Sequence, residues 1–420
     1  MKKVLFLFIV LTTILTSCKQ KDKCADVICP IGYECIDGTC EGSTNNIKIT
    51  SNISVNTTWT NDNVYELSGR ITVLNGVTLS IEPGTIIKGQ VGTGANTSAL
   101  LVARGGKIIA NGSSSLPIIF TSVADEITPK QVQNGNFISP NLDANTSGLW
   151  GGLIILGKAP ISASANEIQI EGIPTTDANG LYGGNEPNDN SGIIRYVSIR
   201  HGGANIGNGN EINGLTLGGV GVGTMVENIE IIGNQDDGVE FFGGTVNVKN
   251  LIVWNPGDDA IDTDQSWAGT LDNFVVVCGS ATDHALEIDG PEGTYLASHT
   301  LINGSIKGSY EAEMGDLRAC PRGSFSNIFF FDFPDPAING GGDFSISNPT
   351  NNTCSTDNLT NGVLTFSNLQ VILPSNVALT SVFKNGTDVY VTSVTNRTVG
   401  ANKSVFNWTW TEQANQLIGF

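Results

Sequence analysis

The sequence has few basic residues and few of the residues that favour helices. Lys and Arg number 21 against 40 Asp and Glu, so the 420-residue chain carries a formal net charge of −19. This charge argues against binding nucleic acid and against charge-driven binding to anionic lipid, because both need a basic surface. The chain is instead rich in glycine, with 51 residues that separate short runs of Val, Ile, Leu and Phe. That pattern is typical of a protein built from many short strands.

The N-terminus holds an apolar run at residues 4–15, preceded by two lysines. The run is too short to span a bilayer and predicts an export signal. It ends in LTSC, which resembles the lipobox of bacterial lipoproteins. The resemblance implies that residues 1–17 are removed, that Cys18 is lipidated and anchors the protein in the membrane, and that residues 18–23 form a linker. Lys19 implies sorting to the outer membrane.

The remaining cysteines fall into two groups. Four of them lie within residues 24–41, namely Cys24, Cys29, Cys35 and Cys40. Closely spaced cysteines in an exported chain predict disulfides, and the absence of a nearby His argues against zinc. The stretches CPIGYEC and DGTC resemble an EGF-like module; three pairings are open, and we favour Cys24–Cys35 with Cys29–Cys40. Further along, Cys278 is expected to be a buried thiol, and Cys320 and Cys354 are candidates for another disulfide.

From residue 42 the chain repeats with a period of about 20 to 25 residues. The segments DDGVEFFGG, DDAIDTDQ and DHALEIDG start at Asp236, Asp258 and Asp283, which are 22 and 25 residues apart. A second strand bounded by glycine follows each of them. One such coil cannot bury its own apolar face, so the repeat predicts a solenoid. We therefore expect an all-β fold, a right-handed parallel β-helix over residues 42–358 with a β-rich C-terminal cap over 359–420.

Other stretches carry a family resemblance. GRITVLNGVTLSIEPGTIIKGQ and GLWGGLIILGKAPIS resemble secreted and lipid-anchored β-helix proteins of Bacteroidetes bacteria, over most of residues 65–345 and again at the closing FNWTW. The resemblance implies the fold and a position in the cell envelope, facing the cell surface, but supplies no activity. Two long polar insertions, 124–146 and 170–191, are either walls of a functional groove or surface decoration. The protein is expected to be a monomer.

Stacking the coils in register also lines up acidic positions. The inward columns are predicted to be Val239, Ile261 and Leu286, then Phe241, Thr263 and Ile288. The outward columns are predicted to be Glu240, Asp262 and Glu287; Phe242, Asp264 and Asp289; and Asp237, Asp259 and His284, with Thr216 starting the first and Glu313 extending it.

Carboxylates about 5 Å apart repel by about 1 kcal/mol in water and about 3 to 4 kcal/mol at an effective dielectric of 20. Exposure to water, a bound cation or protonation can each offset this repulsion, and we expect a solvated face.

These columns supply the candidate site residues. Hard oxygen ligands favour Ca²⁺, so the predicted metal ligands are Asp262, Asp264, Glu287 and Asp289. The predicted ligand-binding residues are Glu240, Asp264, Glu287, Asp289, Trp267 and Arg318, with Trp267 stacking on a sugar ring. The predicted catalytic residues are Asp237, Asp259, Asp262 and His284.

The order of acids and His over these coils is similar to polygalacturonase-type glycosidases. The resemblance implies that Asp237, Asp258, Asp259 and His284 match the acid cluster and histidine of that family. Two departures count against it. His284 is flanked by Asp283 and Ala285 where that family has Gly-His-Gly, and its Arg-x-Lys motif has no counterpart.

Three functions remain open for an acidic solenoid face. The one we favour is binding of an extended polymer, a glycan, with Ca²⁺ as the only expected cofactor. The second is glycan cleavage, by a glycosidase or by a lyase that would use Lys249 or Arg318 as base. The third is a non-catalytic adhesin or envelope scaffold.

Overall fold

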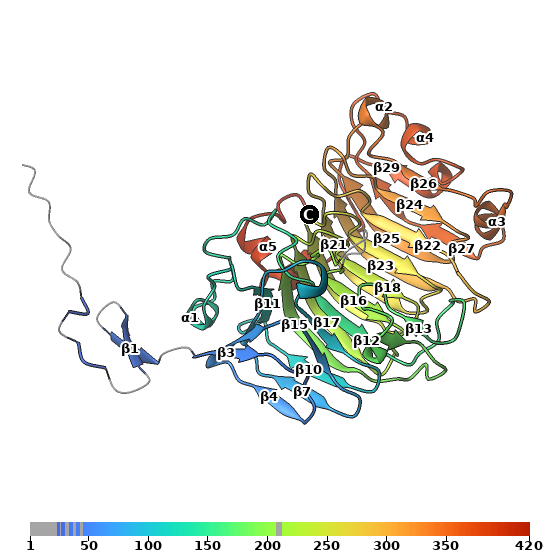
Figure 1. The fold of residues 1–420 in the computed structure, drawn as a ribbon. Coiled ribbons are helices and arrows are strands. Elements are labelled where there is room, and N and C mark those ends of the chain that lie inside the picture. The colour runs from blue at the N-terminus through green and yellow to red at the C-terminus, as the bar shows by residue number, and fades with distance from the viewer. Residues whose placement is uncertain (1–22, 26, 30–32, 37–38, 43–44, 207–211) are drawn as a thin grey trace, which may run out of the picture. The chain divides into compact units, whose positions relative to one another are not determined.

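The computed structural model describes residues 23–25, 27–29, 33–36, 39–42, 45–206 and 212–420. Chain contacts divide the protein into two units, Met1–Asn45 and Asn46–Phe420. The second unit is the predicted parallel β-helix, with its coils stacked in chain order (Figure 1). The all-β prediction is confirmed, because strands from β4 to β29 in the two long sheets pair in parallel with strands of neighbouring coils.

Two long sheets make up the coils, and within the described residues they hold nine and sixteen strands. The nine-stranded sheet consists of β6 (Arg70–Val73), β9 (Ala99–Val102), β12 (Leu153–Leu156), β16 (Leu215–Gly218), β18 (Val239–Phe242), β20 (Ile261–Asp264), β22 (Leu286–Asp289), β24 (Gly315–Arg318) and β26 (Phe344–Ile346). The sixteen-stranded sheet consists of β3 (Asn45–Ile49), β4 (Thr57–Trp59), β5 (Asn63–Leu67), β7 (Thr78–Ile81), β8 (Ile86–Gly89), β10 (Lys107–Asn111), β11 (Ile118–Ser122), β15 (Gly192–Arg200), β17 (Met225–Ile232), β19 (Val248–Trp254), β21 (Thr270–Val277), β23 (His299–Lys307), β25 (Gly323–Phe331), β27 (Leu364–Ser367), β28 (Leu369–Val371) and β29 (Val391–Ser393).

The core lies inside the coils and is built from the predicted columns. Val239, Ile261 and Leu286 are register partners and are completely buried, and Phe241, Thr263 and Ile288 form the adjacent column. Because strand side chains alternate between faces, the residues between them point outward. The register therefore places Glu240, Asp262 and Glu287 side by side on the outer face of the nine-stranded sheet.

An asparagine ladder marks the bend in the long strands of the sixteen-stranded sheet from β17 onward, whereas Tyr196 occupies the equivalent position in β15. Asn228, Asn250, Asn273, Asn303, Asn327 and Asn368 all have positive φ angles between 52° and 64°. Asn is one of the few residues that tolerate this conformation. The amide of Asn250 donates to Asn228 at 2.9 Å and that of Asn273 donates to Asn250 at 2.7 Å. The ladder lets one strand turn a corner, and it repeats once per coil in the sequence, a signal that our sequence analysis missed.

Two insertions pack on the outside of the early coils. The first carries α1 (Pro129–Gln133), and its apolar residues cover the outer face around Ile86 and Ile119. The second carries β13 (Ile168–Gln169), η2 (Ala178–Gly180) and β14 (Leu181–Tyr182), and it covers Leu156 and Phe242 on the nine-stranded sheet. A single turn, η1 (Gly94–Asn96), lies between β8 and β9. The second insertion thus borders the acidic columns.

The C-terminal region contains strands and then short helices. Strands β27 to β29 continue the sixteen-stranded sheet, and residues 394–420 have no strand. This last stretch, the C-terminal segment, packs Phe406 and Trp410 over Trp254 and Phe331 on the outside of that sheet (Figure 1). The helices of this part of the chain are α2 (Pro336–Asn339), α3 (Cys354–Thr360), α4 (Leu379–Val382), η3 (Asp388–Tyr390), η4 (Lys403–Phe406) and α5 (Trp410–Gln413).

A buried ion pair lies under the C-terminal segment. Glu230 accepts hydrogen bonds from the Ser198 hydroxyl at 2.6 Å and from the backbone N–H and hydroxyl of Thr411, both at 2.9 Å. Arg200, which is also buried, lies 3.7 Å from the same carboxylate and packs against the Trp410 ring. A buried charge needs such partners, so this contact fixes the C-terminal segment against the coils.

The N-terminal unit contains an antiparallel pair, β1 (Tyr33–Ile36) and β2 (Thr39–Gly42). Cys24 and Cys29 each take part in a disulfide, and their pairing with the two later cysteines stays a prediction. The predicted signal peptide and Cys18 lie outside the described residues. Elsewhere, the Cys320–Cys354 disulfide and the buried free thiol of Cys278 are both confirmed. Among the described residues, no helix has the length and apolar character needed to cross a membrane.

Candidate functional site

The candidate site is the outer surface of the nine-stranded sheet around β18, β20, β22 and β24. The first predicted column is confirmed from Thr216 through Glu240, Asp262 and Glu287, but Asp316 extends it. Glu313 was wrongly placed there, because it bridges to His284 instead. We call the whole set the acidic face. Its members are Asp237, Glu240, Asp259, Asp262, Asp264, His284, Glu287, Asp289, Glu313, Asp316 and Arg318.

The acidic face is much less exposed than the sequence suggested. Glu240, Asp262 and Glu287 are only 5%, 9% and 6% exposed. The prediction of a solvated face is therefore wrong for this column. Neighbouring side chains and the adjacent insertion cover it, and neither effect can be read from strand alternation. Exposure to water consequently cannot be what offsets the repulsion between these carboxylates, which leaves protons, a cation or basic side chains.

Three carboxylates, Asp237, Glu240 and Asp262, form the buried carboxylate cluster. One oxygen from each lies within 4.8 Å of the others. Burial raises the pKa of all three carboxyls well above the usual range, and the charges of neighbouring acids raise it further. In the described part of the chain no ion pair joins any of the three to a basic residue.

Asn213 completes this cluster from the preceding coil. Its amide nitrogen donates to Glu240 Oε2 at 2.5 Å, so its side chain lies against the carboxylates. The buried Oδ1 atoms of Asn213 and of Asp262 have no hydrogen-bond partner among the described residues. Buried oxygens are normally satisfied, and the two here are the kind of ligand that a hard cation takes. Sequence analysis missed Asn213, although it begins the coil NGLTLGG that matches the acidic repeats.

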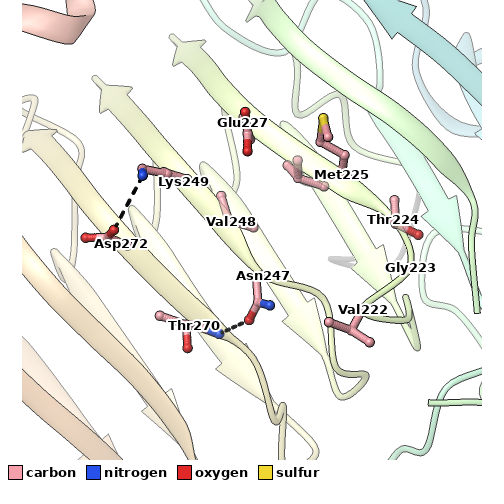
Figure 2. Close-up of a pocket in the computed structure, with 11 residues that line it drawn as sticks. Val222, Gly223, Thr224, Met225, Glu227, Asn247, Val248, Lys249, Thr270 and Asp272 are labelled. Carbon is pink, nitrogen blue, oxygen red and sulfur yellow. Dashed lines mark hydrogen bonds and ion pairs between the residues drawn. The ribbon is translucent and has the colours of Figure 1, made fainter. Parts of the chain in front are cut away.

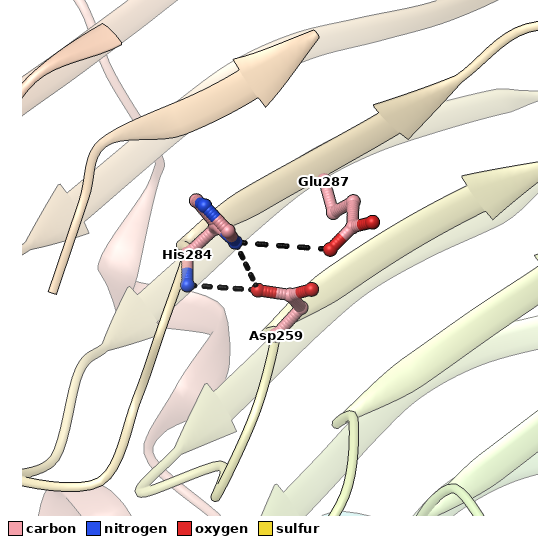
Figure 3. A group of neighbouring side chains, drawn as sticks. All are labelled: Asp259, His284 and Glu287. Atoms are coloured by element: carbon pink, nitrogen blue, oxygen red, sulfur yellow. Dashed lines mark hydrogen bonds and ion pairs between the residues drawn. The ribbon is translucent and has the colours of Figure 1, made fainter. Parts of the chain in front are cut away.

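His284 forms a second group with Asp259 and Glu287 (Figure 3). Its Nδ1 lies 2.8 Å from Asp259 Oδ1 and 3.7 Å from Glu287, while its Nε2 lies 3.7 Å from Glu313. Burial lowers the His284 pKa, but the hydrogen bond to Asp259 and the surrounding negative charges outweigh it and raise the pKa to about 9. The imidazole is therefore protonated at neutral pH. In this form both ring nitrogens donate hydrogen bonds, so the imidazolium itself supplies a positive charge to this group of acids.

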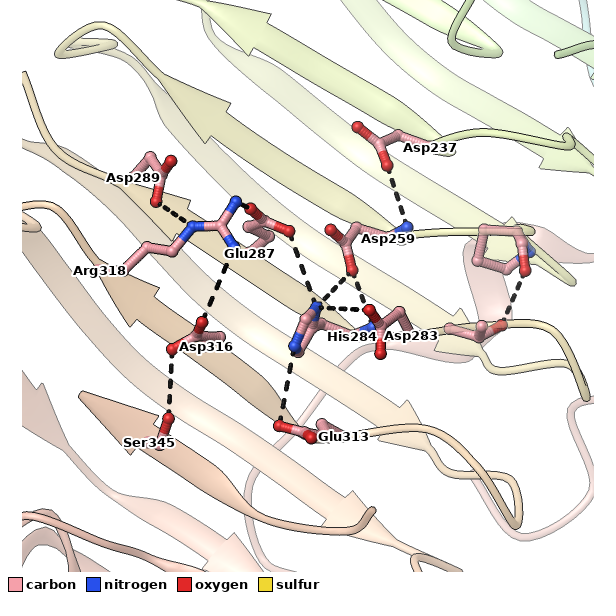
Figure 4. A network of polar contacts seen from close by, with 12 residues as sticks. Asp237, Asp259, Asp283, His284, Glu287, Asp289, Glu313, Asp316, Arg318 and Ser345 are labelled. Carbon is pink, nitrogen blue, oxygen red and sulfur yellow. Dashed lines mark hydrogen bonds and ion pairs between the residues drawn. The ribbon is translucent and has the colours of Figure 1, made fainter. Parts of the chain in front are cut away.

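Arg318 neutralises the third part of the acidic face (Figure 4). Its guanidinium pairs with Glu287, lies 2.9 Å from Asp289 and lies 3.9 Å from Asp316. Burial, together with Asp264 and Asp316, raises the Asp289 pKa to about 7. The four predicted metal ligands therefore do not form one site, because Arg318 holds two of them and only Asp262 belongs to the buried carboxylate cluster.

The second insertion borders this surface on one side. The Tyr182 hydroxyl donates to Gln265 Oε1 at 2.9 Å, and the Gln265 amide donates to Glu292 at 3.0 Å. Asp264 lies next to this contact, and burial, aided by Glu292 and Glu171, raises its pKa to about 7. The insertion thus borders the candidate site on this side.

The opposite border carries an open cleft of about 490 Å³, which we call the edge cleft. Asp258, Asp283, Glu311 and Glu313 are its acidic lining residues. Asp258, a match to the polygalacturonase-type acids, is exposed here, and one of its oxygens lies within 4.8 Å of carboxylate oxygens of Asp236 and Asp237. The cleft therefore lies next to Asp237, one member of the buried carboxylate cluster.

Two sequence-based candidates lie elsewhere. Trp267 is fully buried and stacks on Phe241 at 4.0 Å and on His299 at 5.3 Å inside the coils. The prediction that it stacks on a sugar is wrong, because the left-handed turn before it directs the ring inward. Lys249 lies on β19 of the other sheet, 4.0 Å from Asp272, in a separate surface groove (Figure 2). It cannot act as a base at the acidic face.

The sequence also matches a known family. A family model described as a pectate-lyase-like beta helix domain covers residues 50–413. The chain belongs to this family. Neither the curated proteins nor the solved structures contain a match to the chain. The pectate-lyase-like beta-helix fold is compatible with binding or degradation of polysaccharide.

Proposed function

We propose that the acidic face binds an extended glycan and that the buried carboxylate cluster holds a divalent cation there. The observation that carries the proposal is the cluster itself. Asp237, Glu240 and Asp262 are buried, their oxygens lie within 4.8 Å of one another, and Asp262 Oδ1 has no partner among the described residues. Such a set of oxygens suits Ca²⁺, which takes six to eight oxygen ligands.

A cation would relieve the repulsion that burial intensifies. Two carboxylates about 5 Å apart repel by about 3 kcal/mol at an effective dielectric of 20, so three ionised groups in contact are strongly unfavourable. Without metal, the raised pKa values mean that protons take this role. Bound Ca²⁺ would supply open coordination positions for sugar hydroxyl groups, while Asn213 and Thr216 would orient the carboxylates from the preceding coil.

The repeat supports an extended ligand. Equivalent side chains recur on β18, β20, β22 and β24 at the spacing of neighbouring strands, about 4.8 Å. A polymer that lies across the coils would therefore meet the partly exposed Asp264, Asp289 and Arg318 on three successive strands. The second insertion and the edge cleft border this path.

Glycan cleavage is a second candidate function, because one observation favours it. Burial raises the pKa of Glu240 and of Asp262 well above the usual range, and a carboxyl with a raised pKa is suited to protonate a glycosidic oxygen. Asp259, held by His284 at 2.8 Å, lies in the adjacent column and would activate the attacking water. Cleavage would take place on the same surface as binding, and the two candidate functions differ in whether the glycan is broken into products.

The proposed setting is the bacterial outer membrane. The lipobox-like LTSC implies anchoring through Cys18, and the disulfide module would separate the monomeric β-helix from the lipid. The acidic face would then be displayed toward the cell surface. The observation that motivates this proposal is the sequence of the N-terminal segment alone.

Isothermal titration calorimetry tests the first candidate. We expect Ca²⁺ to bind to the wild-type protein and not to Asp262→Asn, whereas Asp62→Asn, an exposed acid in an early coil, should bind as the wild type does. A panel of polysaccharides is then titrated in Ca²⁺ and in EDTA. Absence of Ca²⁺ binding, or binding that survives Asp262→Asn, would contradict the metal site, and absence of all glycan binding would favour a scaffold.

Product analysis separates binding from cleavage. New reducing ends would indicate a hydrolase, and unsaturated products would indicate a lyase. Activity that survives the double substitution Asp259→Ala and Asp262→Ala would show that the acidic face is not the catalytic site.

A further inference from the structure

We infer that the acidic face takes glycans without carboxylate groups, neutral or amino-substituted, and rejects polyuronates. The inference rests on the proposed function and names the ligand class for that same surface. The inference is motivated by the positions of the cationic side chains and by the carboxylates that already pair with them.

The two cations of the acidic face are both internally compensated. Arg318 is 44% exposed, but its guanidinium contacts the carboxylates of Glu287, Asp289 and Asp316. His284 is only 12% exposed and is bonded to Asp259 at 2.8 Å. A uronate carboxylate would have to displace one of these partners, which would leave a protein carboxylate without its counter-charge.

Two further basic residues near the acidic face, Lys384 and Lys158, also have acidic partners. Lys384, in the last coils, contacts Asp343 at 2.5 Å. Lys158, which follows β12, lies 3.9 Å from Glu186 in the second insertion. Arg322, in the turn after β24, has no acidic partner among the described residues, but its Nε is buried and unexposed to a ligand.

A divalent cation at the buried carboxylate cluster would not give this part of the acidic face a net positive charge. Asp237, Glu240 and Asp262 supply three negative charges when ionised, against two positive charges on the metal. The Asp262 Oδ1 and Asn213 Oδ1 atoms, buried and without partners in the described chain, point to a ligand that is cationic or that donates hydrogen bonds. A carboxylate is neither, whereas a hydroxyl or an ammonium group fits.

The edge cleft is also acidic, and its described lining offers no cationic side chain to a ligand. Its acidic lining residues are Asp258, Asp283, Glu311 and Glu313, and no basic residue is among its described lining. The neighbouring Tyr310 is 61% exposed and its carbonyl accepts a hydrogen bond from Asn339 at the cleft wall. An aromatic ring beside carboxylates suits the apolar face of a sugar or an ammonium substituent. A polyanion is instead repelled by the carboxylates of this cleft and by the net charge of −19.

Matched pairs of oligosaccharides test the inference. Each pair shares one backbone and differs only in charge: oligogalacturonide against its methyl ester, and glucose oligomers against their C6-oxidised acids. Glucosamine oligomers are compared with their N-acetyl forms in the same way, to measure how a positive charge on the ligand changes the affinity. Calorimetry is run on the full protein in Ca²⁺ and in EDTA, at low salt and at about 0.5 M NaCl.

For each backbone that binds, we expect the uncharged form to bind at least about tenfold more tightly than the acid at low salt, with a smaller difference at high salt, where charge is screened. The amino form should bind at least as tightly as its N-acetyl form. The double variant Asp283→Asn, Glu311→Gln neutralises two exposed acids of the edge cleft. It should reduce the difference in affinity between the uncharged form and the acid form. The control Asp62→Asn, Glu126→Gln removes two negative charges outside the edge cleft and should leave this difference in affinity unchanged.

An acid form that binds as tightly as its uncharged partner, or more tightly, would overturn the inference while leaving the proposed glycan site intact. If no member of any pair binds in either Ca²⁺ or EDTA, the proposed function itself fails and the inference falls with it. The two failures are therefore distinguishable in one experiment.

Discussion

Raising the pH without a divalent cation should destabilise the β-helix. A carboxyl whose pKa is raised by folding keeps its proton in the folded state at a pH where the unfolded chain has lost it. The folded state therefore binds more protons, and stability falls as the pH rises from the unfolded pKa to the folded pKa. For Asp264 this window runs from 3.8 to about 7.

His284 acts in the same direction. Its pKa is raised from 6.5 to about 9, so the stability that it contributes is complete below 6.5 and is lost as the pH rises through 9. The carboxyls of Asp237, Glu240 and Asp262, whose pKa values also lie well above normal, add to the loss. All of these groups predict a β-helix that is less stable at pH 8 than at pH 5.

The size of the effect follows from the shift of Asp264 alone. About 3 pH units at 1.36 kcal/mol each give a loss on the order of 4 kcal/mol. With an unfolding entropy of about 2.1 cal/mol/K per residue, over residues 46–420, this corresponds to a fall in Tm of about 5 °C. Bound Ca²⁺ should restore stability at pH 8, because a ligand that binds only the folded state raises the free energy of unfolding.

The assay is thermal unfolding from pH 4 to 9 in EDTA and in Ca²⁺. Asp262→Asn cannot ionise at this position, so its Tm should fall less with pH, and Ca²⁺ should no longer raise it. Asp62→Asn serves as the matched control and should behave as the wild type. A wild-type Tm that is the same at pH 5 and pH 8 in EDTA, together with no effect of Ca²⁺, would refute the reasoning.

Three further predictions concern other parts of the chain. Cys18→Ala should abolish incorporation of a radiolabelled fatty acid and release the protein from the membrane fraction; continued labelling would reject the lipobox assignment. Cys354→Ser should lower the free energy of unfolding by about 3 to 4 kcal/mol, because the disulfide to Cys320 closes a loop across a sequence separation of 34; a smaller loss in denaturant unfolding would show that the bond does little. Trp267→Ala should cost about 3 to 5 kcal/mol, since the ring is packed against Phe241, yet leave the affinity for glycans unchanged; a selective loss of affinity would restore its role in binding.

The fold and the register were predictable because they depend on local repetition. Strand alternation and coil length place Val239 above Ile261, and the same rule then places Glu240 beside Asp262. Coil lengths that vary were harder to interpret. The coil after Glu287 carries a longer connection, so Glu313 was assigned one column away from its true position.

Burial at the acidic face was not predictable from the sequence. Alternation shows that Asp262 points outward, but not that neighbouring side chains and an insertion cover it. The pairing of Arg318 with Asp289 depends on adjacent coils in the same way. Trp267 was misplaced because Gln265 and Ser266 adopt the left-handed conformation that directs its ring inward, and neither residue type signals such a turn in the sequence. These features arise from contacts between segments, which spacing alone does not specify.

The position of a bound cation tests the central claim most directly. Crystals grown or soaked with Mn²⁺ or Ca²⁺ would show it by anomalous scattering. The account predicts a peak between the carboxylates of Asp237, Glu240 and Asp262, at about 2.3 to 2.6 Å from their oxygens for Ca²⁺. A map without a peak there, or with one only at the more exposed Asp236 and Asp258, would contradict it.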